Sequence, residues 1–372
     1  MKIQSLKVDY GDREVGTLAL YKDYFAAFQY SKDWLKTGFS ISPFSLPLKE
    51  DLFIPKMEPF DGLFGVFNDS LPDGWGRLLV DRLMLKNKIN PAKLGNLERL
   101  SIVGDSGMGA LSYKPVADME NNVVSLDLDE LCIECSNLLN TEYSSELDEL
   151  FILGGSSGGA RPKILTTVED KDYIIKFHSK EDNKNIGKLE YDYSLCAKAC
   201  GIEMPKTRLS PSRLCAGYFG VERFDRLQTP PYKRHMVSVS GLLETSHRLP
   251  NLDYNLLMKL TLELTKDISE CKRLYRLMCF NVFAHNRDDH SKNFSYIYLE
   301  DEKRWILSPA YDLTYSNSLG GEHATTVDGE GANPDITHLM NVAKNIGIST
   351  GYAKAVANEI RDVVNEMLEE YL

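Results

Sequence analysis

The chain has 372 residues, of which 43% are hydrophobic and 26% charged, and its formal net charge is −11 at pH 7. This length allows two domains with large cores, and the acidic balance excludes nucleic-acid binding through bulk positive charge. No run approaches the roughly 18 apolar residues that a membrane helix needs, and the first residues lack the features of a signal peptide. We therefore expect a cytoplasmic protein without a membrane partner.

The N-terminal region is predicted to be rich in β-structure. Residues 2–10, 15–21 and 24–30 carry β-branched and aromatic side chains between short polar turns, which predicts a small antiparallel sheet. Residues 100–113, which include three glycines, predict a loop followed by a short apolar strand. Between these parts the sequence predicts a helix with a buried stripe formed by Trp75, Leu78, Leu79 and Leu83.

Residues 116–146 are acidic and poor in aromatic side chains, and they are our candidate domain boundary. A helix is predicted near residues 128–139. It contains Cys132 and Cys135, which have the spacing of half a zinc site, but no second pair follows at a suitable distance. We therefore expect these two residues to pack in a core. The seven cysteines of the chain are expected to be thiols rather than disulfides.

Residues 153–165 form a glycine-rich segment, with four glycines, two serines and then Arg161 and Lys163. Glycines allow backbone N–H groups to turn inward onto phosphates, and the two basic side chains add positive charge. No Gly-Lys-Ser/Thr sequence opens a helix here, so the segment is not a Walker A motif. Glycine-rich turns between strands are common, so the elements that follow decide the interpretation.

A strand over residues 171–177 is predicted to end near Lys176, and a helix over residues 189–201 carries Glu190. A glycine-rich loop, a strand lysine and a helical glutamate occur in this order in the N-lobe of protein kinases. Residues 217–226 would form a further strand of that lobe. Residues 236–241 would cross to a helical C-lobe, which ends in an amphipathic helix with Tyr352, Val356, Ile360, Val363 and Met367 on one face.

The most informative stretch is residues 283–294. Before it, Ile268, Cys271, Leu274, Tyr275, Met278 and Val282 recur at helical spacing. Six of the nine residues from His285 to Asn293 are then charged or amide-bearing, and a hairpin over 294–307 leads to Asp312. Protein kinases arrange their catalytic base and two Mg²⁺ ligands in this order, here Asp288, Asn293 and Asp312. The spacing therefore favours phosphoryl transfer.

Two other interpretations compete with this one. A single aspartate after a helix is more often a cap or turn residue than a catalytic one. A metal-hydrolase site of His285, Asp288, Asp289 and His290 is a second alternative, but the two histidines are five residues apart rather than four, which is a poor fit to one helix face. The spaced trio of aspartate, asparagine and aspartate favours the kinase hypothesis over both.

With these motifs the chain resembles the HipA-type serine/threonine kinases, which are the toxins of bacterial HipBA toxin–antitoxin modules. In the C-terminal part the resemblance rests on the motifs at residues 156–163, 173–176, 222–226, 286–294 and 309–313. In the N-terminal part it rests on residues 71–77 (Leu-Pro-Asp-Gly-Trp-Gly-Arg) and 104–111. The resemblance implies an α+β, protein-kinase-like two-lobed fold with an N-terminal β-rich subdomain. The implied parts are residues 1–146, 147–240 (N-lobe) and 241–372 (C-lobe).

The resemblance also implies roles for individual residues. Asp288 would be the catalytic base, Asn293 and Asp312 would bind Mg²⁺, and Ser156 would be the site of autophosphorylation. The ATP-binding residues would be Gly158, Gly159, Ala160, Arg161, Lys163, Lys176, Ser238, Val239, His290, Lys292 and Tyr311. The inter-lobe segment 235–240 departs from the family pattern, because it lacks the expected acidic pair.

Known members of the family phosphorylate an aminoacyl-tRNA synthetase and are neutralised by HipB, a small DNA-binding antitoxin. For this chain the resemblance implies ATP and Mg²⁺ as cofactors, a protein substrate such as an aminoacyl-tRNA synthetase, and a HipB-like partner through which DNA would be contacted only indirectly. Two alternatives stay open. One is a small-molecule phosphotransferase, and the other is a non-catalytic kinase-like module that binds ATP or an antitoxin.

Overall fold

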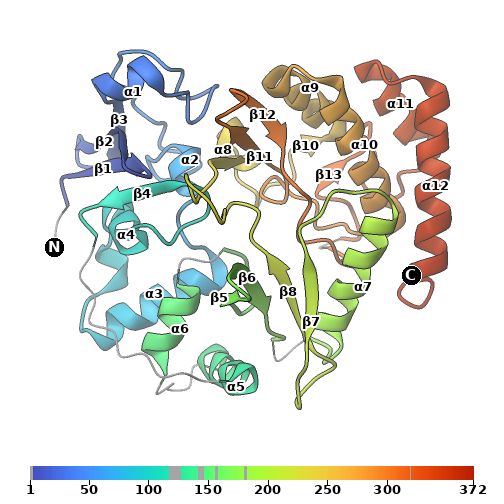
Figure 1. Ribbon diagram of the computed structural model, residues 1–372, viewed down its shortest axis with the longest axis horizontal. Helices are drawn as coiled ribbons and strands as arrows, with labels where there is room; N and C mark the ends of the chain where they lie inside the picture. The colour runs from blue at the N-terminus through green and yellow to red at the C-terminus, as the bar shows by residue number, and fades with distance from the viewer. Residues whose placement is uncertain (1–2, 117–126, 141–145, 156–157, 180–181, 319) are drawn as a thin grey trace. The chain divides into compact units, whose positions relative to one another are not determined.

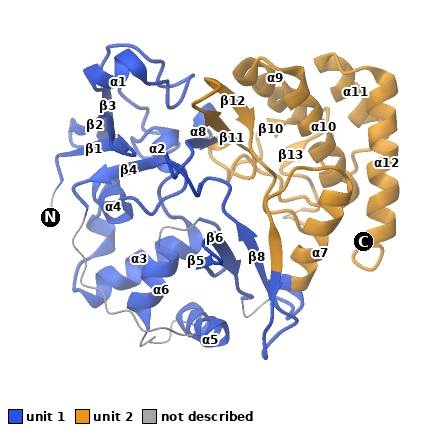
Figure 2. Cartoon of the chain, viewed as in Figure 1, with its two compact units in different colours: residues 1–187, 209–237, 241–245 blue, residues 188–208, 238–240, 246–372 orange. Residues whose placement is uncertain are grey.

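The structure is a computed structural model that describes residues 3–116, 127–140, 146–155, 158–179, 182–318 and 320–372. The chain forms two compact units (Figure 2). Unit 1 contains Met1–Gly187, Leu209–Val237 and Gly241–Thr245, and unit 2 contains Lys188–Arg208, Ser238–Ser240 and Ser246–Leu372. The predicted division into residues 1–146, 147–240 and 241–372 stays a prediction. No helix in the described part of the chain is long and apolar enough to cross a membrane.

Unit 1 begins with a four-stranded antiparallel sheet in the order β3-β2-β1-β4 (Figure 1). Its first three strands confirm the antiparallel sheet predicted from the β-branched and aromatic side chains of residues 2–30. The strands are β1 (Ser5–Tyr10), β2 (Arg13–Tyr21), β3 (Phe25–Tyr30) and β4 (Leu111–Lys114). The short helices near this sheet are α1 (Lys32–Thr37), α2 (Gly65–Asn68), η1 (Pro91–Lys93) and α4 (Asn96–Val103).

Helix α4 corrects one prediction, because residues 100–103 were expected to belong to a loop. Leu97, Leu100 and Val103 are buried at three-residue spacing and give the segment an apolar face. Glu98 accepts a hydrogen bond from the N–H of Gly95 at 3.1 Å, which closes the N-terminal turn. A loop was predicted here because of the glycines that follow, but these glycines lie beyond the end of the helix.

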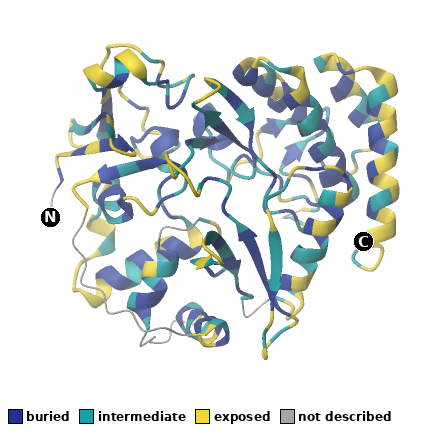
Figure 3. Ribbon diagram, in the orientation of Figure 1, coloured by how far each residue is buried: buried dark blue, intermediate teal, exposed yellow. Residues whose placement is uncertain are grey.

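A second four-stranded sheet has the order β5-β6-β8-β7. Its strands are β5 (Lys163–Val168), β6 (Lys171–Lys176), β8 (Tyr218–Glu222) and β7 (Thr207–Ser210). Three helices share one apolar core with it: α3 (Gly74–Lys86), α5 (Leu128–Leu139) and α6 (Leu147–Gly154). Figure 3 shows their buried faces. The core includes Trp75 of α3, Leu150 of α6 and Ile175 of β6.

Cys132 and Cys135 lie in the same core, as expected from the helical pattern around them. Burial raises the pKa of the Cys135 thiol well above its ordinary value. Among the residues that the structure describes, no group of three or more histidine, cysteine or acidic side chains is arranged to hold a metal ion. Both cysteines thus pack in this core, which agrees with the packing role expected from the sequence.

Unit 2 is mainly helical. The chain enters it through α7 (Ile186–Ala199), and its other helices are α9 (Tyr254–Thr265), α10 (Ile268–Phe283), α11 (Ile336–Ile346) and α12 (Thr350–Leu368). The strands are the antiparallel hairpin β11 (Ser295–Leu299) and β12 (Arg304–Leu307), with the short parallel pair β10 (Leu252–Asp253) and β13 (Thr325–Thr326). Between the units the chain runs through β9 (Met236–Ser238) and α8 (Val239–Leu243).

The buried face of α12 differs from the predicted one. Val356 and Ile360 are buried as expected, but Met367 is 41% exposed. The buried face instead includes Ala353, Ala357, Val364 and Leu368. Small side chains allow close approach to α10, where the hydroxyl of Tyr275 donates to the carbonyl oxygen of Ala353 at 3.3 Å. Two alanines therefore define this face, and the apolar pattern alone could not distinguish it from the neighbouring one.

Candidate active site

Helix α10 positions the polar loop that follows it in unit 2. The helix begins at the N-cap Asp267, whose carboxylate accepts from the N–H of Ser269 at 2.8 Å. At the other end, Asn286 attaches the loop to the helix by two bonds to Asn281, both of 2.9 Å, one from its backbone N–H and one from its side-chain amide. His285, between them, has a φ of 50°. The chain therefore turns sharply as it leaves the helix.

Further along this loop, Asp288 and Asp289 have different environments. The side chain of Asp288 is 61% exposed, and its carboxylate lies 3.8 Å from His290 Nε2. The carboxylate of Asp289 is buried. Its Oδ2 accepts from the hydroxyl of Tyr254 at 2.9 Å and lies 3.0 Å from His323 Nδ1. Burial, reinforced by the negative charge of Asp289, raises the pKa of Tyr254 well above its ordinary value. Of the two carboxylates, only that of Asp288 is exposed to solvent.

Asn293 is held against the backbone of Asp288. Its side-chain amide donates to the carbonyl oxygen of Asp288 at 2.7 Å, and its N–H donates to the carbonyl oxygen of His290 at 2.8 Å. Because the amide nitrogen is used in this way, the amide oxygen is the atom of Asn293 that can bind a cation. These hydrogen bonds thus fix the position of Asn293, the first predicted Mg²⁺ ligand, relative to Asp288, the predicted base.

The hairpin β11–β12 delivers the segment that contains Asp312. The hydroxyl of Tyr311 donates to the carbonyl oxygen of Lys292 at 2.8 Å, and the N–H of Lys292 donates to His290 Nδ1 at 3.2 Å. The structure therefore brings His290, Lys292, Asn293 and Tyr311 together with Asp288. Asp312 follows with a φ of 54°, a left-handed conformation that is uncommon for a residue other than glycine and is found often at functional sites.

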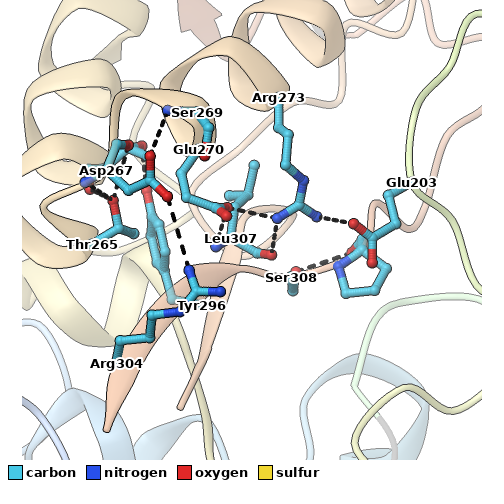
Figure 4. Close-up of polar contacts among 12 residues, drawn as sticks. Glu203, Thr265, Asp267, Ser269, Glu270, Arg273, Tyr296, Arg304, Leu307 and Ser308 are labelled. Atoms are coloured by element: carbon cyan, nitrogen blue, oxygen red, sulfur yellow. Dashed lines mark hydrogen bonds and ion pairs between the residues drawn. The ribbon is translucent and has the colours of Figure 1, made fainter. Parts of the chain in front are cut away.

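A polar network around Arg273 holds the end of β12 (Figure 4). Glu270 accepts from the N–H of Leu307 at 2.9 Å, and Arg273 donates to the carbonyl oxygen of Leu307 at 2.9 Å. Arg273 also pairs with Glu270 and Glu203, both at 2.6 Å. The carbonyl oxygen of Glu203 accepts from the N–H of Ala310 at 2.8 Å. These contacts fix the chain on the way to Asp312. They could not be predicted from the sequence, which shows only the helical spacing of Glu270 and Arg273.

The donor set of this loop and hairpin suits Mg²⁺. Asp312 offers a carboxylate and Asn293 an amide oxygen, and hard oxygen donors of this kind are preferred by Mg²⁺. Such sites use one or two protein carboxylates and complete their coordination with water and substrate phosphates. The hydrolase alternative fits less well, because the carboxylate of Asp289 is committed to Tyr254 and to the N–H of Thr325.

The predicted phosphate-binding residues lie in unit 1, in the glycine-rich turn (residues 158–162) and the adjoining strands. Lys163 begins β5 and is opposite Lys176 of β6. Two lysines opposite each other place like charges on neighbouring strands. Arg161 pairs with Asp182 at 3.2 Å. Ser156, the predicted autophosphorylation site, lies outside the described residues.

Ser238 and Val239, which were predicted to contact the nucleotide, lie where the chain enters unit 2. Both residues are buried. The N–H of Val239 donates to the carbonyl oxygen of Phe294 at 2.8 Å, and the N–H of Ser240 donates to that of Ser291 at 3.0 Å. These bonds tie the segment to the polar loop that follows α10 and to the residue that precedes β11. The role of these two residues in adenine binding stays a prediction.

Comparison with known proteins identifies the family. A model described as the HipA N-terminal domain matches residues 6–114, and one described as the HipA-like C-terminal domain matches residues 155–369, which is more than half of the chain. The chain belongs to the HipA family. No curated protein sequence matches it.

Solved structures support the same fold. HipA from the toxin–antitoxin system of Shewanella oneidensis MR-1, solved with HipB and its operator DNA, superposes with a TM-score of 0.73 at 20% sequence identity. The match covers 98% of this chain and 90% of that one. It confirms the predicted mixed α and β, HipA-like fold. The Helicobacter pylori proinflammatory kinase CtkA matches 56% of this chain and 89% of its own at 12% identity, but its TM-score of 0.38 is too low to bear on the fold.

Proposed function

We propose that this HipA-family chain is an ATP- and Mg²⁺-dependent serine/threonine protein kinase of the HipA toxin type. The observation that carries the proposal is the arrangement in unit 2, where an exposed Asp288 is bonded through its backbone to Asn293 and is followed by Asp312 in a left-handed conformation. Membership of the HipA family supports the general assignment as a toxin-type kinase. The specificity for serine or threonine comes only from the resemblance.

In the proposed reaction, the hydroxyl oxygen of a serine or threonine attacks the γ-phosphorus of ATP. A new oxygen–phosphorus bond forms, the bond between the γ-phosphorus and the bridging oxygen breaks, and ADP leaves. Asp288 accepts the hydroxyl proton. Mg²⁺, held by Asn293 and Asp312, would neutralise phosphate charge. Lys163, Lys176 and the N–H groups of the glycine-rich turn would bind phosphate oxygens, since phosphoryl transfer depends mainly on positioning and charge.

Three further parts of the proposal concern partners and regulation. The protein substrate is expected to be an aminoacyl-tRNA synthetase or a similar cellular protein. The expected binding partner is a HipB-like antitoxin, through which DNA would be contacted indirectly; the relative from Shewanella was solved with HipB and DNA. Autophosphorylation is expected at Ser156.

The test is incubation of the purified chain with ATP and Mg²⁺, with and without candidate synthetases, followed by intact-mass and peptide mass spectrometry. We expect 80-Da additions on serine or threonine for the wild type and none for Asp288→Asn. ATP consumption without modified protein would indicate a small-molecule phosphotransferase. ATP binding without any consumption would indicate a non-catalytic module. Either result would overturn the proposed function.

A further inference from the structure

The start of helix α3 is in direct contact with the glycine-rich turn, and both lie in unit 1. Asp73 is the N-cap residue of α3, but its side chain makes no capping bond to the helix. An N-cap aspartate ordinarily accepts from one of the first helical N–H groups. Here its carboxylate oxygen Oδ1 accepts a short hydrogen bond from the N–H of Gly159 instead. The carboxylate of Asp73 is therefore hydrogen-bonded to the glycine-rich turn and not to the first N–H groups of α3.

Both backbone groups of Gly159 are held by this helix start. While its N–H donates to Asp73, its carbonyl oxygen accepts from the N–H of Trp75 at 2.9 Å. Gly159 has a φ of +85°, a conformation that residues with a side chain rarely adopt. Two hydrogen bonds from the start of α3 thus fix Gly159, a residue whose own backbone has little conformational preference.

Gly74 allows the two backbones to approach this closely. A Cβ atom at Gly74 would lie 2.4 Å from the carbonyl oxygen of Gly159 and 2.9 Å from the Cα of Ala160. Both neighbours are backbone atoms, so neither can move aside as a flexible side chain would. The φ of Gly74 is +44°, which adds strain for any other residue. The contact therefore requires glycine at this position.

Trp75 extends the attachment to the other end of the turn. Its indole Nε1 donates to the carbonyl oxygen of Lys163 at 3.1 Å. Its ring is 1% exposed and packs in the core with Ile164 and Ile175. The first residue of β5 is therefore fixed to a rigid, buried side chain. Gly159 and Lys163, which lie near the two ends of the segment predicted to bind phosphate, are thus both hydrogen-bonded to the start of α3, Gly159 through Asp73 and Trp75 and Lys163 through Trp75.

We propose that Asp73, Gly74 and Trp75 are positioning residues that pre-organise the glycine-rich turn for the phosphates of ATP. The inference rests on the proposed function, because it takes the turn as the phosphate site. A glycine-rich segment loses much conformational entropy when it becomes ordered. If the turn is already fixed in the free protein, nucleotide binding loses less free energy to ordering. The N-terminal region would thereby set the ATP affinity of the kinase.

The decisive comparison is between Asp73→Ala and Asp73→Asn in the full chain. Alanine removes the acceptor for the N–H of Gly159, whereas asparagine keeps an acceptor oxygen and removes the charge. We expect Asp73→Ala to raise the Kd for Mg–ATP, measured by calorimetry, by about tenfold, which is the scale of one lost hydrogen bond to a charged group. Asp73→Asn should stay within about threefold of wild type. At saturating ATP, kcat should change much less than KM.

Hydrogen exchange gives a readout that does not depend on nucleotide. Peptides that cover Gly159 should exchange faster in Asp73→Ala than in wild type, and Asp73→Asn should restore most of the protection. Gly74→Ala should act in the same direction, since its Cβ displaces the turn. Asp335→Ala is the matched control, because Asp335 caps α11 by accepting from the N–H groups of Thr337 and His338. It should leave ATP affinity unchanged.

The outcomes separate the two proposals. Unchanged exchange at Gly159 in Asp73→Ala, or unchanged ATP affinity despite faster exchange, would overturn the positioning role. Tighter ATP binding by both Asp73 variants would also overturn it, because the carboxylate would then compete with phosphate for the N–H of Gly159. A wild-type protein that binds no ATP would overturn the proposed function itself, and this is visible before any variant is compared.

Discussion

Asp288 and Asp289 are consecutive in sequence, but only the first has an exposed carboxylate: its side chain is 61% exposed, whereas that of Asp289 is fully buried. The buried carboxylate is surrounded by donors, with the hydroxyl of Tyr254 at 2.9 Å and the N–H of Thr325 at 3.1 Å. Asp289 therefore anchors the loop, whereas the carboxylate of Asp288 faces solvent. Asp288 is therefore the proposed catalytic base, and Asp289 stabilises the loop. An aspartate-to-asparagine substitution at each position tests its role.

Asp288→Asn is expected to abolish phosphoryl transfer while it leaves the fold and ATP binding intact. The change is isosteric, and it removes only proton acceptance and one charge at an exposed position. Loss of a general base typically lowers the rate by about 10²–10⁴. Phosphate incorporation and calorimetric ATP affinity are the measurements. Turnover at the wild-type rate would show that Asp288 is not the base.

Asp289→Asn is expected to destabilise the protein instead. The amide group that replaces one carboxylate oxygen would face donors, and leaving buried donors unpaired costs about 1–3 kcal/mol. Urea unfolding monitored by circular dichroism measures the effect. Asp288→Asn is the matched control and should stay within about 0.5 kcal/mol of wild type, as most exposed substitutions do. Equal stability of the two variants would contradict the anchoring role of Asp289.

Elements with a strong local pattern could be predicted from the sequence. Helix α10 has the expected buried stripe, except that Ile268 is 38% exposed, and the hairpin β11–β12 and the strands β1 to β3 lie in the segments for which they were predicted. The prediction of a loop at residues 100–103 was wrong, because the apolar pattern of α4 covers few residues and is followed by glycines. The predicted face of α12 was correct for Val356 and Ile360 but not for Met367, and the buried face includes Ala353 and Ala357, whose small side chains are weak signals of burial.

The contacts that position the candidate site could not be predicted in this way. Asp73 meets Gly159 across 86 residues of sequence, and Asp289 meets His323 across 34. Nothing in the local pattern of any of these residues indicates its partner. The sequence motifs indicated which residues could take part in a reaction. The residues that support them could not be identified in this way, because their roles depend on long-range contacts that only the three-dimensional structure shows.

Asp312→Ala is expected to make ATP affinity independent of Mg²⁺. The carboxylate is the one charged protein ligand in the proposed site, and losing a charged contact typically weakens binding roughly tenfold or more. Calorimetry with and without Mg²⁺ measures the effect. Asp301→Ala, in the exposed turn of the same hairpin, is the control and should keep the Mg²⁺ dependence. Equal ATP affinity of the wild type with and without Mg²⁺ would refute the assignment of Asp312.

His235 is expected to weaken the fold at acidic pH. Its ring is buried, its Nε2 lies 2.7 Å from the carbonyl oxygen of Ile41, and burial lowers its pKa from 6.5 to about 4. As the pH falls below 6.5, the unfolded chain takes up a proton that the folded protein does not bind until about pH 4. The free energy of unfolding should therefore fall by up to about 3 kcal/mol across this window.

The measurement for His235 is urea unfolding at a series of pH values, compared with His235→Gln. Glutamine keeps a neutral donor and cannot titrate, so the difference between the two proteins isolates this residue from the carboxylates. His338→Gln, at a partly exposed position on α11, should retain the wild-type dependence. A parallel pH dependence of the wild type and His235→Gln would contradict the prediction.

Ser156→Ala is expected to prevent self-inactivation. A phosphate on Ser156 would add about −1.5 to −2 charges, and these would compete with the phosphates of ATP for Arg161 and Lys163, five and seven residues further along the chain. After long incubation with ATP and Mg²⁺, the wild type should carry one phosphate on the peptide that contains Ser156 and should bind ATP more weakly. Ser156→Ala should stay active, and Ser157→Ala should still be modified at Ser156. A wild type that stays fully active once it is modified would refute the prediction.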